Sequence, residues 1–266
     1  MSHVFVIAEA GISHDGDLRK ALTLVDWAKE AGADAVKFQT FNAKALCKRR
    51  GKPELDLILK PYEMPLAWLP LLKDHADKVG VEFMTTCFDE ETLKVVAPLV
   101  KRFKIGHGEK RDEAFYMAHV AYDKPIIASN GEWEAGGKTS FLHCIERYPC
   151  PFSAADLAGI QREGCQGYSD HTRNVLTGGF AVAAGAQIVE VHFRDWYTNN
   201  DNLDWPVSLC PSDLRSYIEL IRQAESAVYG AGSEETKKLE RPGSAPHTSH
   251  LPASEESDRS GEYPAA

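Results

Sequence analysis

The sequence predicts an α/β protein folded as a (β/α)8 TIM barrel. Eight short runs rich in apolar and β-branched residues recur along the chain, and most of them are followed by a stretch with helical periodicity. Polar residues stand near the carboxyl end of nearly every run, which is where the active sites of such barrels gather. The length of 266 residues fits one barrel, which needs about 250.

The expected strands alternate with helices, and this alternation indicates parallel pairing with right-handed crossovers. The strands are expected at residues 4–11, 35–41, 82–88, 102–108, 125–131, 139–146, 165–172 and 187–193. The clearest helical patterns lie at residues 17–31, 172–184 and 211–229. An open doubly wound sheet is the alternative, but no G-x-G-x-x-G follows the first strand.

Two regions depart from regular alternation. Only residues 132–138 separate the fifth and sixth strands, which is too few for a crossover helix, so we expect the fifth helix to be shortened or missing. Residues 231–266 are rich in Ser, Pro, Glu and Arg and poor in core-forming residues, which is typical of a flexible polar tail. We therefore expect a barrel domain at residues 1–230 and a tail at 231–266.

The charge and composition exclude several classes of function. A formal net charge of −9 argues against nucleic acid or an anionic membrane as a partner, because both would be repelled. The chain contains neither a long apolar run nor a recognisable signal peptide, so we expect a cytoplasmic protein. Its six cysteines form no C-x-x-C pair, which favours reduced thiols over a zinc knuckle or a disulfide framework.

Two histidines stand at matching positions in the last two predicted strands. His171 ends the segment Gly-Tyr-Ser-Asp-His. His192 lies two residues after Glu190, so Glu190 and His192 point to the same face of their strand. Two imidazoles on adjacent strands can share one divalent ion and leave positions open for water and substrate. The alternative is a pair of hydrogen-bonded core histidines.

Two lysines stand within otherwise apolar strands. Lys37 and Lys104 are expected to be buried, and a buried lysine needs an anion. A phosphate or carboxylate at the barrel mouth is one candidate, which nearby hydroxyls would also bind. These hydroxyls belong to Thr86, Ser129 and Ser169. The alternative is an ion pair inside the barrel. Its available carboxylates are Glu9, Glu109 and Glu190.

Three carboxylates lie where they can act in catalysis. Glu9 and Glu109 end predicted strands, where a carboxylate binds a hydroxyl, transfers a proton or neutralises a lysine. Asp204 lies in the loop after the eighth strand, within reach of the metal or its water, although a plain turn aspartate is equally compatible. The basic cluster at residues 48–50 either steers an anionic substrate or forms a solvated run.

Over most of residues 5–230, the chain resembles the N-acetylneuraminate (sialic acid) synthases, which condense phosphoenolpyruvate with an open-chain N-acetylhexosamine. The similarity covers the order and spacing of the matching segments as well as the residues within them. The segments are IAEAGISHDGDL, AGADAVKFQTF, FKIGHGE, KPIIASNGE, LHCIERYPCP, GYSDHT and VEVHF. The resemblance implies the barrel fold and a condensation of the same type.

The resemblance also implies roles for individual residues. His171 and His192 would bind a divalent ion, Mn²⁺ by preference, that polarises the substrate aldehyde as a Lewis acid. Asp204 would hold a metal-bound water, and Glu9 and Glu109 would hold the acceptor or its aldehyde. The residues implied to bind the phosphate and carboxylate of phosphoenolpyruvate are Lys37, Thr86, Lys104, Ser129 and Ser169, with Gln39 and Tyr148 nearby.

Three segments depart from the family pattern. His107 replaces a phosphate-binding serine, and an imidazole can bind phosphate as well. Glu146 stands where members usually carry an asparagine, and its carboxylate would repel phosphate unless it is protonated or paired with Arg147 or Lys104. The family's S-T-G-M reads SNGE here, which places Asn130 and Glu132 at the mouth. We therefore count His107 and Glu146 as catalytic candidates and Asn130 as substrate-binding.

The sequence thus predicts a metal-dependent transferase that joins phosphoenolpyruvate to an aldehyde other than N-acetylmannosamine and releases phosphate. Two alternatives stay open: a metal-dependent aldolase or lyase that does not use phosphoenolpyruvate, which His107 and Glu146 favour, and a non-catalytic binding protein. The family's C-terminal antifreeze-like domain, through which members dimerise, has no counterpart in this sequence. The oligomeric state therefore stays open, with a homodimer among the possibilities.

Overall fold

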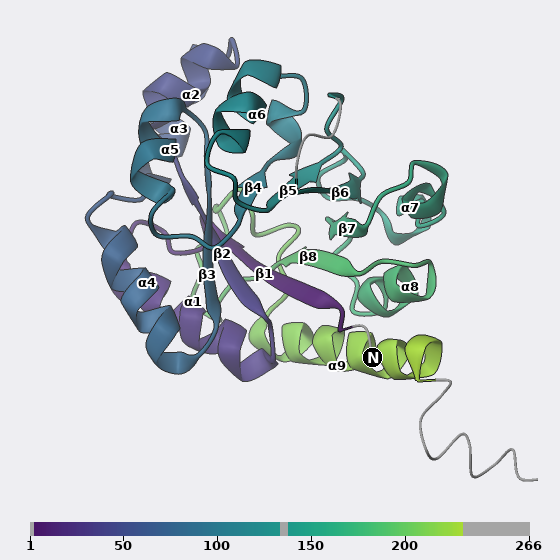
Figure 1. Cartoon of the computed structure of the whole chain (residues 1–266). Coiled ribbons are helices and arrows are strands. Elements are labelled where there is room, and N and C mark those ends of the chain that lie inside the picture. The colour runs from purple at the N-terminus through teal and green to yellow at the C-terminus, as the bar shows by residue number, and fades with distance from the viewer. Residues whose placement is uncertain (1–2, 134–137, 231–266) are drawn as a thin grey trace, which may run out of the picture. The chain divides into compact units, whose positions relative to one another are not determined.

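The computed structural model describes residues 3–133 and 138–230, and within them eight parallel strands close into a barrel (Figure 1). The strands follow one another around the barrel in sequence order, and the last pairs with the first. Glu9 of the first strand lies opposite His192 of the last. The predicted (β/α)8 fold is confirmed, whereas the predicted tail at 231–266 lies outside the described residues.

All eight predicted strands form, each within its expected range. Their bounds are β1 Phe5–Gly11, β2 Ala35–Thr40, β3 Glu82–Cys87, β4 Phe103–Ile105, β5 Ile126–Ser129, β6 Thr139–Cys144, β7 Gly167–Asp170 and β8 Ile188–His192. The strands are shorter than predicted, since one or more residues at one or both ends of each range lie outside the ladder. His107 and His171 lie just beyond their strands.

Helices cover most of the outside of the barrel. Their bounds are α1 Leu18–Ala31, α2 Ala43–Arg49, α3 Asp56–Leu59, α4 Trp68–Val79, α5 Glu90–Val96, α6 Glu113–Val120, α7 Gly159–Arg162, α8 Thr177–Ala183 and α9 Pro211–Tyr229. The expected helices at 17–31 and 211–229 agree closely with α1 and α9. The Asp17 side chain caps α1, and Gly32 ends it with a φ of 89°. None of the helices in the described ranges is long and apolar enough to cross a membrane.

The expected helix at 172–184 begins later than predicted, because α8 starts only at Thr177. Asp170, Thr172 and Asn174 each accept a hydrogen bond from the backbone N–H two residues further on. Such local side-chain turns compete with helical hydrogen bonds. The helix predicted from the apolar periodicity of this segment is confirmed only for its second half.

The connection between β5 and β6 is the thinnest part of the helical layer. Its described residues, 130–133 and 138, contain no helix, as the short spacing predicted. The next connection contains one turn of 3-10 helix at Phe152–Ala154 and the four-residue α7. The barrel is therefore covered most heavily on the side of β1 to β4 (Figure 1).

The barrel interior is built in two layers, and this arrangement places the site. The lower layer is apolar and fully packed, and it consists of Ile7, Ala35, Met84, Ile127 and Leu142, with Phe5 and Ile188 against them. Side chains alternate along a strand, so the next inward residue lies two positions further on. Those residues are polar: Glu9, Lys37, Thr86, Ser129, Cys144 and Glu190.

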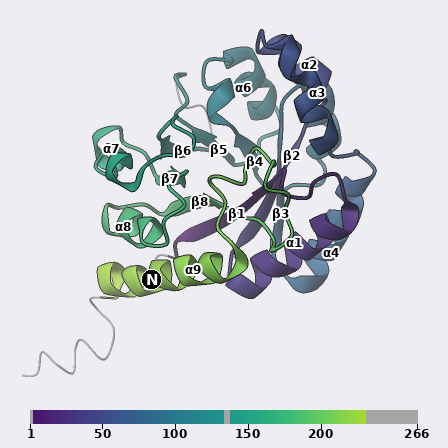
Figure 2. The same cartoon turned by 180° about the vertical axis from the view of Figure 1, so that it is seen from behind.

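The connection from β8 to α9 crosses the carboxyl end of the barrel before it descends (Figure 2). It is tied to the segment after β1, where the Asn202 amide donates to the carbonyl of Ile12 and the Thr198 hydroxyl donates to that of Ser13. This long loop brings Asp204 over the first strand, far from its own place in the sequence.

Asp34 fastens α9 to the amino end of β1. Its carboxylate accepts hydrogen bonds from the Val6 backbone N–H at 2.8 Å and from Arg222 at 2.9 Å, and His3 lies at 2.7 Å. Burial alone would raise the pKa of Asp34, but the bonds from His3, Val6 and Arg222 outweigh it and lower this pKa below its ordinary value. The carboxylate therefore stabilises the folded chain in its ionised form.

We expect Asp34→Asn to lower the free energy of unfolding by about 2 kcal/mol at pH 7, because it removes charged hydrogen bonds. Since the folded-state pKa is depressed, the stabilisation is present above about pH 4 and is lost as the pH falls below it. Urea unfolding at pH 7 and below pH 4 measures this dependence. Asp77→Asn, in an exposed pair with Lys73, is the control and should cost far less. A penalty that does not change with pH would contradict the expectation.

Candidate active site

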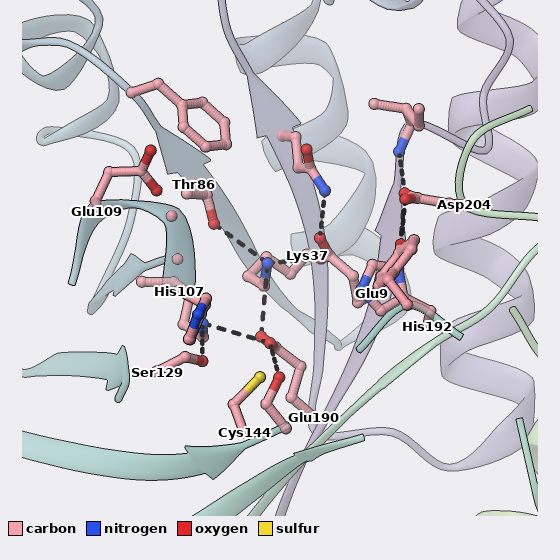
Figure 3. A pocket seen from close by; sticks show the side chains of 18 of the residues that line it. Glu9, Lys37, Thr86, His107, Glu109, Ser129, Cys144, Glu190, His192 and Asp204 are labelled. Carbon is pink, nitrogen blue, oxygen red and sulfur yellow. Dashed lines mark hydrogen bonds and ion pairs between the residues drawn. The ribbon is translucent and has the colours of Figure 1, made fainter. Parts of the chain in front are cut away.

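A cavity of about 320 Å³ opens at the carboxyl ends of the strands (Figure 3). Every strand of the barrel contributes a side chain to its wall, either from its own end or from the loop that follows. Fourteen of the fifteen predicted site residues line it, all except Asn130. Their individual roles stay predictions, but the structure brings them together.

Two buried lysines and two buried glutamates form an ion network at the floor of the cavity (Figure 3). The Lys37 ammonium lies 2.8 Å from the Glu9 carboxylate and 3.5 Å from Glu190. The Lys104 ammonium lies 3.4 Å from Glu190 and donates to the Ser129 hydroxyl at 2.9 Å. The alternative of a lysine–carboxylate pair inside the barrel is thus the observed arrangement, at the same place as the predicted anion site.

Charge–charge attraction keeps this network ionised despite its burial. Burial raises the pKa of Glu190, but Lys104 and Lys37 outweigh it and lower that pKa to about 2. Burial lowers the pKa of Lys37, but Glu190 and Glu9 outweigh it and raise that pKa. With two positive and two negative groups, the floor is neutral, and each lysine also contacts a hydroxyl. The Thr86 hydroxyl lies 3.2 Å from Lys37.

Glu109 does not pair with a buried lysine, although it was one of the candidates for this. Its Oε1 accepts hydrogen bonds from Arg49 at 2.9 Å and Arg50 at 2.7 Å instead. The sequence allows the basic cluster at 48–50 to be either a group that steers an anionic substrate or a solvated run. Two of its members, Arg49 and Arg50, lie at the site, at the end of α2. Glu109 Oε2 is buried and has no hydrogen-bond partner among residues 3–133 and 138–230, so it can accept one from a ligand.

His171 and His192 face one another with their ring centroids 5.5 Å apart. His171 Nδ1 lies 3.1 Å from the Ile145 carbonyl, so Nδ1 carries the proton and Nε2 keeps its lone pair. Burial and the nearby His192 lower the pKa of His171 to about 4. Burial also lowers the pKa of His192, but Asp204, Glu9 and Glu190 outweigh it and raise that pKa.

Asp204 closes the cavity on the histidine side. It accepts hydrogen bonds from the Tyr148 hydroxyl and, at 3.2 Å, from the Ile12 backbone N–H, and it lies 3.6 Å from His192 Nδ1. Burial raises its pKa, but His192 and these hydrogen bonds outweigh it and lower the pKa to about 2. The turn interpretation of this residue is therefore incomplete, because its carboxylate is buried in the site wall.

Asn130 corrects the sequence-based prediction, because it does not line the cavity. Its side-chain oxygen accepts from the Cys144 N–H at 2.9 Å and its amide nitrogen donates to the Cys144 carbonyl at 2.5 Å. The amide is thus used between β5 and β6 and is not available to a substrate. The same nitrogen lies 3.3 Å from His107 Nδ1, which places Asn130 behind the site.

The predicted partners of Glu146 are also wrong. The structure places its carboxylate 3.4 Å from His107 Nε2, and neither Arg147 nor Lys104 contacts it. Glu146 is 77% exposed, whereas His107 is 17% exposed. Two of the residues that depart from the family pattern, His107 and Glu146, therefore contact each other at the mouth of the cavity.

A family model described as the NeuB family matches residues 24–234, which is most of the chain. The chain belongs to the NeuB family. A related N,N'-diacetyllegionaminic acid synthase of Legionella pneumophila is 35% identical over 90% of this chain and 76% of its own length. A pseudaminic acid synthase of Campylobacter jejuni is 30% identical over 85% of this chain and 75% of its own.

A solved structure with the same architecture is that of N-acetylneuraminic acid synthetase from Leptospira borgpetersenii in complex with citrate. It superimposes with a TM-score of 0.78 at 29% identity, over 90% of each chain. The predicted resemblance to sialic acid synthases is confirmed, and with it the prediction of an enzyme that forms carbon–carbon bonds.

A substitution at Gly11 of β1 tests whether the position of the Asp204 side chain depends on the space that this glycine leaves. Its φ is +51°, and a Cβ there would overlap the Asp204 carboxylate. We expect Gly11→Ala to lower the free energy of unfolding by about 2–4 kcal/mol, from left-handed strain and overlap together.

Gly51→Ala is the matched control, since Gly51 has a φ of +67° and nothing within 4 Å of its Cβ position. It should cost about 1 kcal/mol, the strain alone. Urea unfolding of both variants gives the two values. Equal losses would show that Asp204 can move aside without cost.

Proposed function

We propose that this enzyme condenses phosphoenolpyruvate with the aldehyde of a sugar-like acceptor in a reaction that depends on a divalent metal, and that it releases phosphate. The observation that carries the proposal is the division of one cavity into a lysine side and a histidine side. Lys37 and Lys104 lie at the floor, while His171 and His192 lie against Asp204.

The lysine side suits an anion with several oxygens. Two ammonium groups, three hydroxyls and the backbone of one strand end converge within a buried space. The hydroxyls are those of Thr86, Ser129 and Ser169. Charge-assisted hydrogen bonds of this kind hold phosphate and carboxylate groups strongly. The phosphate and carboxylate of phosphoenolpyruvate together match this set of hydrogen-bond donors.

The histidine side fits a divalent metal with two protein ligands. The Ile145 carbonyl fixes the tautomer of His171 and leaves its Nε2 free, which is the usual support for a metal-bound imidazole. A ring separation of 5.5 Å allows both rings to reach one ion at about 2.1 Å from each nitrogen. Among the described residues, no group of three or more His, Cys, Asp or Glu is spaced to hold a metal, so this proposal assigns the ion two protein ligands.

When bound, the metal would act as a Lewis acid on the acceptor aldehyde. The protein's own residues do the rest. The enol carbon of phosphoenolpyruvate forms a bond to the aldehyde carbon, and the aldehyde oxygen takes up a proton. The resulting cation at C2 adds water, which gives up one proton. The C2–O bond to phosphate then breaks, C2 becomes a ketone, and the second proton of the water leaves with the phosphate. Lys37 and Lys104 stabilise the phosphate through these steps. The free Oε2 of Glu109 accepts a hydrogen bond from an acceptor hydroxyl and so orients the acceptor.

The acceptor in this proposal is an aldehyde other than N-acetylmannosamine. The named relatives are synthases of different acids, legionaminic, pseudaminic and N-acetylneuraminic, so membership in the family does not fix the acceptor. The aldolase alternative loses its main support, because the Glu146 carboxylate contacts His107 and forms no ion pair with either lysine of the floor among the described residues. The homodimer and the cytoplasmic location stay predictions.

Purified enzyme with Mn²⁺, phosphoenolpyruvate and a panel of aldoses should release inorganic phosphate with at least one of them. We expect His171→Ala to lower kcat/KM by about 100-fold or more, because it removes one of two metal ligands and with it several kcal/mol of charge stabilisation. His75→Ala is the control, since His75 pairs with Asp26 away from the cavity, and it should keep full activity.

Two results would contradict the proposal. One is the absence of phosphate release with every aldehyde. The other is a His171→Ala variant that retains Mn²⁺-dependent activity. Mn²⁺ binding measured by calorimetry separates a metal defect from a catalytic one, because His171→Ala should weaken it and His75→Ala should not.

A further inference from the structure

Two side chains from neighbouring strand ends meet across the mouth of the cavity. His107 begins a short 3-10 turn at His107–Glu109 after β4, and Glu146 follows β6. His107 Nε2 and Glu146 Oε2 are 3.4 Å apart, which is longer than a good hydrogen bond. Both residues line the cavity together with Lys104 and Ser129. The contact therefore lies on the side of the cavity that suits an anion.

The proton of the neutral His107 ring is fixed on Nε2, the atom that lies 3.4 Å from Glu146. The Cys144 N–H binds the side-chain oxygen of Asn130, so the Asn130 amide nitrogen must face the other way, toward the Cys144 carbonyl and His107 Nδ1. An amide nitrogen only donates, and His107 Nδ1 must therefore accept. The donor of this ring is Nε2–H, which has no hydrogen-bond partner within the described residues.

Glu146 is held much more loosely than His107. Its side chain is 77% exposed and has no other ion pair among the described residues. It can turn into solvent without losing a buried contact. The nearest other charged groups that line the same cavity are Lys104, Arg50 and Glu109, and each has its own partner.

We propose that His107 and Glu146 form a latch that the anionic substrate displaces: His107 Nε2–H binds the phosphate of phosphoenolpyruvate, and the Glu146 carboxylate, which lies 3.4 Å from Nε2 without a hydrogen bond to it, must turn away to admit that phosphate. This proposal rests on the proposed function and names the residues that set affinity for its first substrate. Two anions cannot share one donor, since their like charges repel, so Glu146 turns outward when the phosphate enters.

A latch gives the two residues opposite effects on the same binding constant. Removal of the His107 donor weakens phosphoenolpyruvate binding, because a bound phosphate oxygen loses a partner. Removal of the Glu146 charge strengthens binding, because no competitor has to be displaced. A pair that only stabilised the mouth would instead weaken binding in both cases.

The test is calorimetric binding of phosphoenolpyruvate to the full chain with Mn²⁺ present. We expect Glu146→Gln to lower the Kd about threefold to tenfold, as removal of one repulsive charge predicts. We expect His107→Ala to raise the Kd about tenfold or more, and His107→Gln, which keeps an N–H donor, to recover part of the loss. The KM for the acceptor should change much less than that for phosphoenolpyruvate.

Glu132→Gln is the matched control. Glu132 is a partly exposed carboxylate near the same strand ends, but it pairs with Lys110 and Arg111 and does not line the cavity. Its Kd for phosphoenolpyruvate should equal that of the unchanged enzyme. Thermal unfolding of each variant shows whether it is folded, and His107→Gln replaces His107→Ala if the latter is not.

The outcomes separate the latch from the function on which it rests. If the unchanged enzyme does not bind phosphoenolpyruvate, the proposed function fails. If it binds, and Glu146→Gln leaves the Kd unchanged or raises it, the latch is overturned while the function stands. If both His107 variants bind as the unchanged enzyme does, His107 does not contact the phosphate, and the latch is overturned as well.

Discussion

The structure depends on one constraint, the charge balance of the barrel interior. Glu190 lies between Lys37 and Lys104, and Glu9 lies against Lys37, so that two positive and two negative groups share one buried place at the floor of the cavity. A buried charge without a partner is very costly, which means that none of these four residues can be lost alone. The strand registers that bring them together are therefore specified by this network as well as by apolar packing. It keeps two ammonium groups charged at the one place where an anionic substrate can use them.

The apolar layer below supports the network and fixes its height in the barrel. Glu9, Lys37 and Glu190 each stand two positions after a residue of this layer or one packed against it, so a slip of one residue in β1, β2 or β8 would exchange a packed side chain for a charged one. The histidine side is built differently. His192 comes from a strand, but His171 and Asp204 come from the residues beyond, and Gly11 leaves the space that Asp204 needs. The strands of the barrel therefore hold the lysine side of the cavity, and the loop from β8 to α9 completes the histidine side.

The sequence was sufficient for the barrel and for most of the site, because both follow from short-range periodicity. Alternation along a strand and the common direction of parallel strands bring Lys37, Lys104 and His192 to one end without any knowledge of distant contacts. The errors concern competition for hydrogen bonds. Asn130 has the same polar amide whether it binds a substrate or the Cys144 backbone, and only the structure shows which. The late start of α8 is an error of the same kind, because local side-chain turns replace the expected helical hydrogen bonds. So is the pairing of Glu109, which binds Arg49 and Arg50, far from it in the sequence, and not a buried lysine.

The same division explains where the specificity of this enzyme must be encoded. Groups that come from strands have little freedom to move, and they hold the parts of the reaction that any acceptor shares: an anion, an aldehyde and the site for a metal. Glu109 is held from outside the barrel by arginines at the end of α2, in the long connection from β2 to β3, and Asp204 comes from the loop after β8. Loops tolerate changes of sequence that strands do not. A different acceptor therefore requires changes in these two connections, while the lysine floor can stay as it is.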